Sequence, residues 1–299
     1  MLLTGATAGA AIGPGGAPTP AGDAPPPPSP AGKPAADAPS AGNLSLLFAR
    51  TAPRKSFYFG VRYPSLRYGI GSDQQQNDLR IDVVNTKGEA VFTFYRNDVE
   101  PNVENSIRWD GTTSVGRPVP NGRYRFRIQA QAGGTPLIRA KRSATRSASR
   151  PVTLGFAMYA YAFPLLGSHD FGSSGARFGA GRSGHTHQGH DVMARCGIPI
   201  VAARGGRVQY SGWDGAAGNY VVIDGRGSRF DMAYMHMLRP SLLKKGALVR
   251  TGEPIGVVGS TGSSTACHLH FEMWGAPGWY EGGSPVDPLS YLLRWDRYS

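Results

Sequence analysis

Apolar and polar side chains alternate along several short segments in the middle of the chain. Residues 79–83 place Leu, Ile and Val at every second position, and residues 123–128 alternate three arginines with Tyr, Phe and Ile. A period of two puts one set of side chains on each face of a β-strand. Turn signals such as Asn121-Gly122 separate these runs. Residues 45–152 are therefore predicted to form a β-sandwich.

The second half of the chain, residues 153–299, predicts a further set of strands. Only residues 288–293 show a helical pattern, and glycine-containing turns separate the strand segments. Because no long helix connects one strand to the next, the expected sheet is mostly antiparallel. The fold class is accordingly mainly β. The expected strands are 198–202, 207–210, 220–223, 232–236, 254–258 and 268–274.

The start of the chain differs in composition from the rest. Residues 1–42 consist mostly of Ala, Pro and Gly, and four consecutive prolines occupy positions 25–28. Such a segment buries little apolar surface, so residues 1–44 are expected to be a disordered leader and linker. Residues 1–12 are mildly apolar but no Lys or Arg precedes them, which indicates a poor or truncated export signal, or a start codon placed too far downstream. No run reaches about 18 apolar residues, so no transmembrane segment is expected.

The chain has a net charge of +12, and the basic excess lies mostly in its middle region. Residues 51–150 hold 17 Lys and Arg against 8 Asp and Glu. A basic field favours anionic partners such as nucleic acid, a membrane surface or acidic cell-wall polymers. The alternative is that the excess of basic residues only keeps the protein soluble. For the alternating arginines within residues 123–127 we favour a solvated outer face over a polymer-binding surface. Charge alone identifies no nucleic-acid-binding motif, so no nucleic-acid partner is expected.

The chain has two cysteines, Cys196 and Cys267, and both lie near runs that contain His and Asp. In a secreted chain they would form a disulfide, and in a cytosolic chain they would be two buried thiols. A third alternative makes them metal ligands, but nearby His and Asp side chains already supply enough donors. The pattern by itself leaves these alternatives open.

Three short runs contain the candidate chemistry. A segment with seven glycines, residues 167–189, leads into the first run, His-Gln-Gly-His-Asp at 187–191; Tyr-Met-His at 234–236 and His-Leu-His at 268–270 follow. Imidazole nitrogen and carboxylate oxygen are good zinc donors, and a catalytic zinc site needs three protein ligands and an open position. Together the runs can supply these ligands and two further imidazoles.

The paired histidines suit this chemistry because His268 and His270 share one face of a strand while Leu269 points into the core. One imidazole can then bind a metal while the other faces the substrate. The chain contains no His-Glu-x-x-His, which excludes the helix-borne zinc peptidase arrangement. The other histidines, at positions 169, 185 and 190, are expected to be solvated loop residues.

The three runs, with the motifs between them, resemble the lysostaphin-like zinc endopeptidases, which cleave peptide bonds in bacterial peptidoglycan. The resemblance covers almost all of residues 153–299 and includes Phe178-Gly179 and the segments 218–223, 259–262 and 285–288 in family order. It implies an antiparallel sheet with an open groove and one Zn²⁺ ion as cofactor. The implied ligands are His187, Asp191 and His270, and the implied catalytic residues are His236 and His268.

The same resemblance gives further expectations. Cys196 and Cys267 would form a disulfide that braces the strand of the paired histidines. Arg182 and Tyr220 are expected to contact the substrate. We assign His268 as general base towards the activated water and His236 as hydrogen-bond donor to the developing oxyanion. The sequence leaves the opposite assignment of these two histidines open.

Within residues 45–152, a shorter resemblance concerns the fold alone. Trp109-Asp110-Gly111, Gly116 and residues 119–124 resemble the immunoglobulin-like domain of flagellar hook-capping proteins. The pattern covers only the last two strands and their loop, and it says little about function. It predicts an immunoglobulin-like sandwich.

Taken together, we expect a secreted zinc metalloendopeptidase of the bacterial cell envelope, monomeric, that acts on peptidoglycan peptides. The alternative is a non-cleaving protein that binds the cell wall or activates a partner amidase. A scaffold role would need flagellar-type assembly segments, which the sequence lacks. Because non-cleaving relatives would be expected to lose ligands and all five His and Asp positions are filled, the enzyme is favoured. The peptidoglycan bond that is cut stays open.

Overall fold

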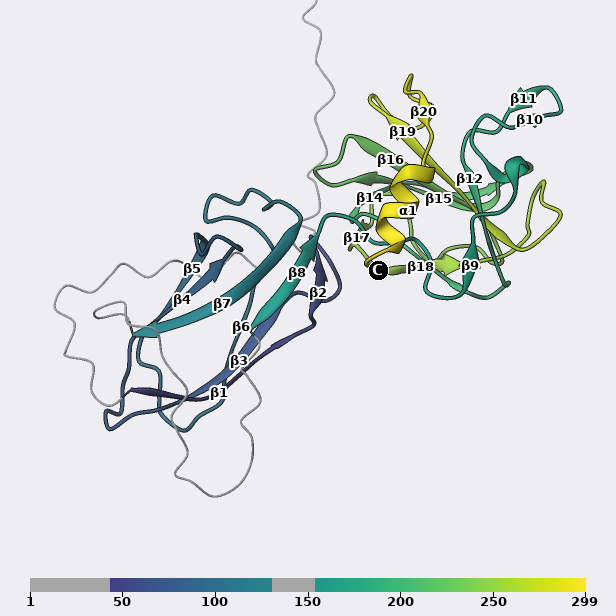
Figure 1. Cartoon of the computed structure of the whole chain (residues 1–299). Coiled ribbons are helices and arrows are strands. Elements are labelled where there is room, and N and C mark those ends of the chain that lie inside the picture. The colour runs from purple at the N-terminus through teal and green to yellow at the C-terminus, as the bar shows by residue number, and fades with distance from the viewer. Residues whose placement is uncertain (1–43, 131–153) are drawn as a thin grey trace, which may run out of the picture. The chain divides into compact units, whose positions relative to one another are not determined.

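The computed structural model describes residues 44–130 and 154–299 of the chain. The predicted leader, residues 1–44, lies outside these ranges except for Leu44, and so does the predicted domain boundary at 152–153. Within both ranges nearly all regular structure is β-strand (Figure 1), as predicted. The described residues contain one α-helix, α1 (Leu289–Asp296), and in these ranges no helix has the length and apolar character needed to cross a membrane.

The first part of the chain forms two sheets. One has the strand order β1-β3-β6 and the other β2-β8-β7-β4-β5. All neighbouring strands in them are antiparallel except β2 and β8, which are parallel. The bounds are β1 (Ser45–Ala52), β2 (Lys55–Phe57), β3 (Ser65–Gly71), β4 (Leu79–Val84), β5 (Ala90–Arg96), β6 (Asn105–Arg108), β7 (Gly122–Ala130) and β8 (Gly155–Tyr159).

A common apolar core joins these two sheets. Leu66 of β3, Ile81 of β4 and Phe126 of β7 belong to one buried cluster, and the Trp109 ring packs edge-on against Phe156 with 5.8 Å between ring centroids. The period-two pattern of β7 therefore separates core from surface as predicted, whereas on β4 Asp82, which alternates with core residues, is buried as well. The immunoglobulin-like classification of this part stays a prediction.

Strand β8 lies on the far side of the predicted boundary at residue 152. It pairs with β7 and with β2 in the five-stranded sheet, so this sheet extends to Tyr159. The pattern of residues 155–159 alone cannot reveal this, because both partners are distant in sequence and one of them is parallel.

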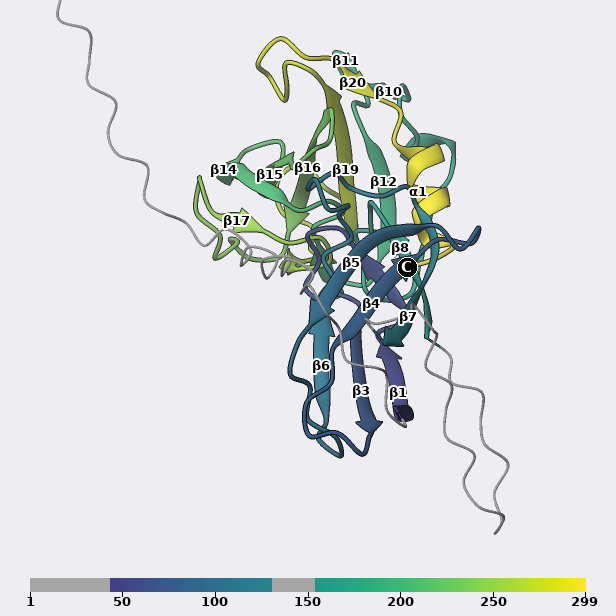
Figure 2. The same cartoon turned by 90° about the vertical axis from the view of Figure 1, so that its left-hand side faces the viewer.

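The second part of the chain is built on one large antiparallel sheet. Its strand order is β17-β14-β15-β16-β19-β12-β9, with β20 paired to β19. Figure 2 shows β14, β15, β16, β19 and β12 side by side. The bounds are β9 (His169–Asp170), β12 (His190–Ala194), β14 (Gly206–Asp214), β15 (Gly218–Gly225), β16 (Phe230–Met237), β17 (Leu248–Val249), β19 (His268–Gly275) and β20 (Pro285–Val286).

Shorter elements complete this part. Two small antiparallel sheets are β10 (Gly181–Arg182) with β11 (His185–Thr186), and β13 (Pro199–Val201) with β18 (Pro254–Val257). The 3₁₀-helix η1 (Ser174–Ala176) lies in the glycine-rich segment. All six strands predicted for this region are present, in antiparallel pairings as expected.

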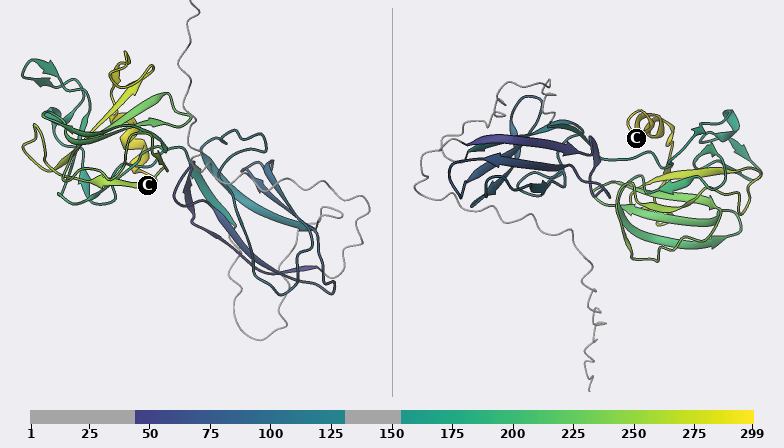
Figure 3. Two further views of the ribbon diagram at one scale, coloured as in Figure 1. Left: turned by 180° about the vertical axis from the view of Figure 1, so that it is seen from behind. Right: turned by 90° about the horizontal axis from the view of Figure 1, so that it is seen from below.

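The two faces of β19 divide the core of this part from the candidate site. Leu269, Phe271 and Met273 point into the main apolar cluster, which also includes Trp295 of α1. The helix lies against one side of the sheet (Figure 3), with the rings of Trp295 and Phe271 6.2 Å apart. Because side chains alternate along a strand, residues 268, 270 and 272 point to the opposite face.

Candidate metal centre

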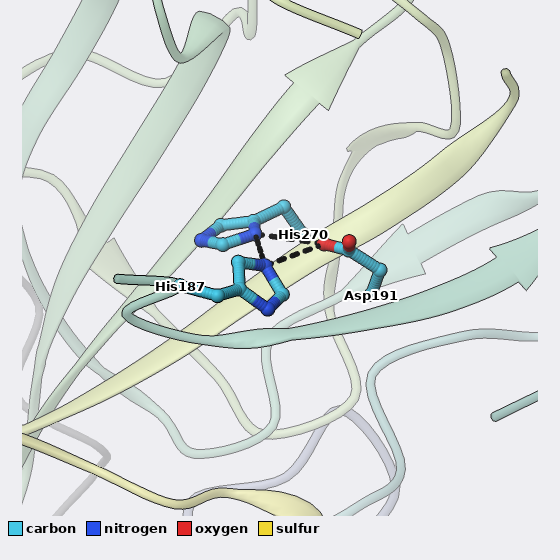
Figure 4. Close-up of side chains that lie close together, drawn as sticks. All are labelled: His187, Asp191 and His270. Carbon is cyan, nitrogen blue, oxygen red and sulfur yellow. Dashed lines mark hydrogen bonds and ion pairs between the residues drawn. The ribbon is translucent and has the colours of Figure 1, made fainter. Parts of the chain in front are cut away.

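Three side chains from neighbouring segments converge on this face of the sheet (Figure 4). Asp191 on β12 and His270 on β19 are directly paired in the antiparallel register, and His187 lies in the segment that leads into β12. The distances are 2.8 Å from His270 Nδ1 to Asp191 Oδ1, 3.0 Å from His187 Nε2 to the same oxygen, and 2.9 Å between the two nitrogens. The register of two strands and one short loop thus builds the cluster.

The outer ring nitrogens of the two imidazoles fix which nitrogen carries the proton. His187 Nδ1 lies 2.8 Å from the carbonyl oxygen of Arg177, which can only accept, so this nitrogen donates. His270 Nε2 lies 3.0 Å from a carboxylate oxygen of Glu272 and donates in the same way. In the neutral rings both inner nitrogens therefore present lone pairs to each other and to the Asp191 oxygen.

This arrangement of three acceptors fits a divalent cation. A tetrahedral zinc ion with bonds of about 2.0–2.1 Å would hold its ligand atoms roughly 3.3 Å apart, close to the spacing of 2.8–3.0 Å found here. Ligating imidazoles in proteins usually donate their second nitrogen to a carbonyl or carboxylate, as His187 and His270 do. The donor set and its outer contacts therefore fit a divalent cation such as zinc.

The charges within the cluster respond strongly to one another. Burial alone would raise the pKa of Asp191, but hydrogen bonds that His187, His268 and His270 donate when both of their ring nitrogens are protonated hold this pKa well below its usual range. Burial alone would lower the pKa of His270, but its hydrogen bonds to Asp191 and Glu272 raise it to about 9. When no cation is bound, a proton on His270 relieves the repulsion between the three acceptor atoms. Protons and a metal ion therefore compete for this centre.

Gly189 allows the ligand segment to pass close to β19. A Cβ atom at this position would lie 2.5 Å from the Phe271 carbonyl oxygen and 2.8 Å from His270 Nε2. Distances this short exclude any side chain larger than a hydrogen atom unless the backbone moves. The glycine between His187 and Asp191 therefore sets the distance between the two segments that carry the ligands.

His268 lies next to the three ligand side chains. Its Nδ1 donates to the carbonyl oxygen of Ala266 at 2.9 Å, and its Nε2 lies 3.5 Å from Asp191 Oδ1. The neutral ring therefore presents the lone pair of Nε2 towards the cluster.

His236 reaches the same face through an unusual backbone conformation. Tyr234 and Met237 of β16 belong to the main core, whereas Met235 packs on the other face. His236 has a φ of 59°, a left-handed conformation that is uncommon outside glycine. Its ring lies 4.8 Å from that of His268 and 5.8 Å from that of His270. The backbone at this position interrupts the alternation and brings the imidazole to the site.

The environment of His236 keeps its ring neutral. Its pKa is lowered to about 4, chiefly by burial, and the neighbouring His268 and His270 contribute in the same direction. Its Nδ1 donates to the Thr261 carbonyl oxygen at 2.7 Å. The neutral ring thus offers Nε2 as an acceptor rather than a donor.

Of the two residues expected to contact substrate, Arg182 contacts the cluster and Tyr220 packs beside Trp279. Arg182 donates from Nη2 to Asp191 Oδ2 at 3.3 Å and to the Gly175 carbonyl at 2.9 Å, so it contacts a candidate metal ligand. Tyr220 on β15 is half-buried, and its ring lies 5.7 Å from that of Trp279. Their contacts with substrate stay predictions.

The cysteines form the disulfide expected from the family resemblance. Cys196 and Cys267 are bonded, with 5.2 Å between their Cα atoms. The bond connects the end of β12 to the start of β19, the two strands that carry Asp191 and His270. No free thiol is therefore left to act as a metal ligand.

The burial of two histidines in the site region differs from the prediction, and one buried glutamate there was not predicted to have a role. His190 is fully buried and its Nε2 contacts the Phe171 carbonyl oxygen at 3.0 Å, and His169 is half-buried against Phe163, so the prediction of solvated loop residues was wrong for both. The glutamate is Glu272, which is buried beside His270 and for which the sequence predicts no role. Its spacing of two residues from His270 on one strand was the available signal.

Comparison with known proteins gives a match over the same region. The sequence profile of peptidase family M23 matches residues 185–288, which include all five His and Asp positions. The Pseudomonas aeruginosa protein named lipoprotein NlpD/LppB homolog is 34% identical over 148 residues, which make up 50% of this chain and 45% of that protein. The Vibrio cholerae peptidoglycan DD-endopeptidase ShyC is 41% identical over 86 residues, 29% of this chain and 19% of that protein.

A solved structure is similar over this part of the chain as well. The catalytic domain of the antimicrobial peptidase lysostaphin from Staphylococcus simulans is 30% identical, with a TM-score of 0.37. The similarity covers 42% of this chain and 92% of that domain. By contrast, the chain spans less than half the length of these curated relatives from Pseudomonas aeruginosa and Vibrio cholerae.

Proposed function

We propose that the chain is a zinc-dependent endopeptidase that hydrolyses peptide bonds in bacterial peptidoglycan, on the ground that residues 185–288 match the sequence profile of peptidase family M23. The observation that carries the proposal is the convergence of His187 Nε2, Asp191 Oδ1 and His270 Nδ1 within 3.0 Å of one another, with lone pairs facing inward. The name of the relative ShyC supports peptidoglycan as the substrate class.

In this proposal His187, Asp191 and His270 hold one zinc ion. The ion, when bound, supplies a Lewis acid for the scissile carbonyl and acidifies a water molecule. The protein's own contribution is to hold the ligands in place. The outer hydrogen bonds of the two imidazoles fix their orientation, and the paired register of β12 and β19 fixes the spacing of Asp191 and His270.

His268 is the proposed general base. Its Nδ1 proton is committed to the Ala266 carbonyl, so a proton taken from water is accepted at Nε2, on the side of the ligands. General base catalysis of this kind is typically worth about 10²–10⁴-fold in rate. The imidazolium formed in this way can return the proton to the leaving amine.

His236 is proposed as the second imidazole that handles protons. We expected it to donate a hydrogen bond to the oxyanion, but its Nδ1 proton is committed to the Thr261 carbonyl. It can therefore donate from Nε2 only after taking up a proton there, and in the resting protein it is an acceptor. Either His236 or His268 can therefore accept a proton as general base. Single variants of each residue distinguish the two assignments.

The cell envelope is the proposed location. Disulfides form and persist in oxidising compartments outside the cytosol, and the bond between Cys196 and Cys267 agrees with this. The similar protein from Pseudomonas aeruginosa is named a lipoprotein. We propose an exported protein on these two grounds.

Digestion of purified peptidoglycan tests the proposal. The full chain is incubated with peptidoglycan of several cross-link types, and the products are identified by mass. We expect cleavage by the zinc-loaded chain, retained zinc but loss of about 10²–10⁴ in rate for His268→Ala, and loss of zinc and activity for His270→Ala. A chain that binds zinc and peptidoglycan but releases no fragment would favour the alternative, a non-cleaving wall-binding or amidase-activating protein.

A further inference from the structure

Glu272 is enclosed directly beside the ligand His270. It lies two residues further along β19 on the same face, and only 3% of its surface is exposed. One carboxylate oxygen accepts from His270 Nε2 at 3.0 Å. The other oxygen accepts from the indole nitrogens of Trp274 at 2.8 Å and Trp279 at 3.1 Å. A buried carboxylate is costly without partners, so these three donors keep its charge in place.

Trp279 connects this carboxylate to the loop of residues 276–284, which joins β19 to β20. The backbone N–H of Trp279 also donates to Asp231 Oδ2 at 2.9 Å. The next residue, Tyr280, donates from its hydroxyl to Gln188 Oε1 at 3.0 Å, and Gln188 directly follows the ligand His187. The loop is thus attached at two points to residues adjacent to metal ligands.

The same loop presents a large exposed side chain. Tyr280 is 65% exposed, and it has a φ of 50°, a conformation that persists only where surrounding contacts hold it. Its ring packs against those of Trp274 and Trp279, with centroids 4.9 and 4.7 Å away. Any molecule that moves Tyr280 therefore acts on the two indoles that bind Glu272.

We propose that Glu272 is a positioning residue that orients the imidazole of His270 and couples it, through the indole of Trp279, to the loop 276–284. The inference rests on the proposed zinc-dependent function. Orientation follows because a carboxylate held by two indoles gives the His270 N–H one fixed acceptor. Coupling follows because the loop supplies one of those indoles. Since coupling between two sites is reciprocal, the loop position affects zinc affinity, and zinc binding affects the loop.

Zinc affinity, measured by competition with a chromophoric chelator, tests the first half of the proposal. Glu272→Gln keeps the side-chain shape but removes the charge and one acceptor, and we expect about 10–100-fold weaker zinc binding. Trp279→Phe and Trp274→Phe each keep an aromatic ring and remove one indole donor. For each we expect zinc binding weakened by about 3–10-fold, the equivalent of a single hydrogen bond.

Trp213→Phe is the matched control, because Trp213 is 62% exposed on β14 and lies outside this network. Its zinc affinity should equal that of the wild type. Thermal unfolding of each zinc-free protein separates positioning from folding. A merely structural Glu272 would lower the unfolding temperature of the zinc-free variant without changing the zinc affinity of the folded fraction, and this result would overturn the proposal.

Tryptophan fluorescence tests the coupling to the loop. Zinc loading of the wild type should change the emission of Trp274 and Trp279, and the change should persist in Trp213→Phe but decrease in Trp279→Phe. Equal zinc affinity of wild type and Trp279→Phe, together with an unchanged fluorescence response, would contradict the coupling. A wild-type chain that binds no zinc would contradict the proposed function itself, whereas normal binding by Glu272→Gln contradicts only this inference.

Discussion

Asp191 Oδ1 and His270 Nδ1 lie 2.8 Å apart because their residues are directly paired across the antiparallel strands β12 and β19. A register shift of one residue would turn either side chain to the opposite face of the sheet. The geometry of the candidate metal centre therefore depends on the pairing of these two strands. Changes that disturb the pairing should weaken metal binding without touching a ligand.

Gly189→Ala is such a change. The added methyl group would lie 2.5 Å from the Phe271 carbonyl oxygen of β19, so the ligand segment must move. We expect about 1–3 kcal/mol lower stability and weaker zinc binding, measured by chelator competition. Gly181→Ala is the control, because its methyl group meets no atom within 4 Å. If both variants bind zinc as the wild type does, the close approach at Gly189 is not needed for the centre.

The disulfide holds the same two strands at one end of their pairing, beyond the pair of Met193 and His268 and at the far end from Gly189. Cys196 and Cys267 are 71 residues apart in sequence, and closing a loop of this length stabilises the folded state by about 4 kcal/mol in the chain-entropy model. We expect the double variant Cys196→Ser, Cys267→Ser to lose stability of this order in urea unfolding. Reductant should destabilise the wild type and leave the double variant unchanged. A double variant as stable as the oxidised wild type would contradict the bracing role.

The sandwich part has its own pH-dependent stability at Asp82. Burial alone would raise the pKa of this carboxyl, but hydrogen bonds from Arg127, Thr93 and Arg80 outweigh it and lower the pKa. A group whose pKa is lower in the folded state stabilises it above the unfolded pKa, near 4, and this stabilisation is lost as the pH falls through the folded value. The contribution of Asp82 should therefore be complete at pH 7 and disappear in acid.

Asp82→Asn measures this contribution. We expect a loss of about 1–3 kcal/mol at pH 7, because a buried carboxylate loses its charged hydrogen bonds to two half-exposed arginines, and a difference from the wild type that shrinks below pH 4. Urea unfolding at several pH values gives both quantities. Asp73→Asn, at an exposed position, should behave as the wild type throughout. An Asp82→Asn defect of equal size at pH 7 and pH 2 would show that charge is not the cause.

Histidine variants distinguish the two proton-handling roles. His268 and His236 both donate from Nδ1 to a backbone carbonyl, so either can accept a proton at Nε2. We expect His268→Ala to lose about 10²–10⁴ in kcat with zinc binding intact, and His236→Ala to retain zinc as well. If peptidoglycan cleavage by His268→Ala equals that of the wild type while His236→Ala is inactive, the base is His236.

The sequence was sufficient to predict the strands and the residues that converge at the site. The period-two pattern located β19 and placed Leu269 in the core, and both are found. The pattern could not reveal the backbone conformation at His236, because alternation predicts the core face for this residue and only the φ of 59° turns it to the site. An alternating sequence pattern predicts the side-chain direction only for residues with regular strand conformation. A single residue with a strained backbone conformation, such as His236, departs from it.

Contacts between distant segments were the other limit. The parallel pairing of β8 with β2 joins residues about one hundred positions apart, and the burial of His190 depends on Phe171 in a neighbouring segment. The function of Glu272 depends on Trp279, which lies across a turn. Such contacts are set by the packing of the whole domain, and no local signal in the sequence encodes them.

The proposed activity depends most directly on zinc bound by His187, Asp191 and His270. The most direct measurement is the rate of peptide-bond cleavage in purified peptidoglycan as zinc is titrated into chelator-treated full-length protein. We predict no cleavage without zinc, full cleavage at one equivalent, and no recovery in His270→Ala. Cleavage by the zinc-free wild type at the rate of the zinc-loaded protein would contradict the account.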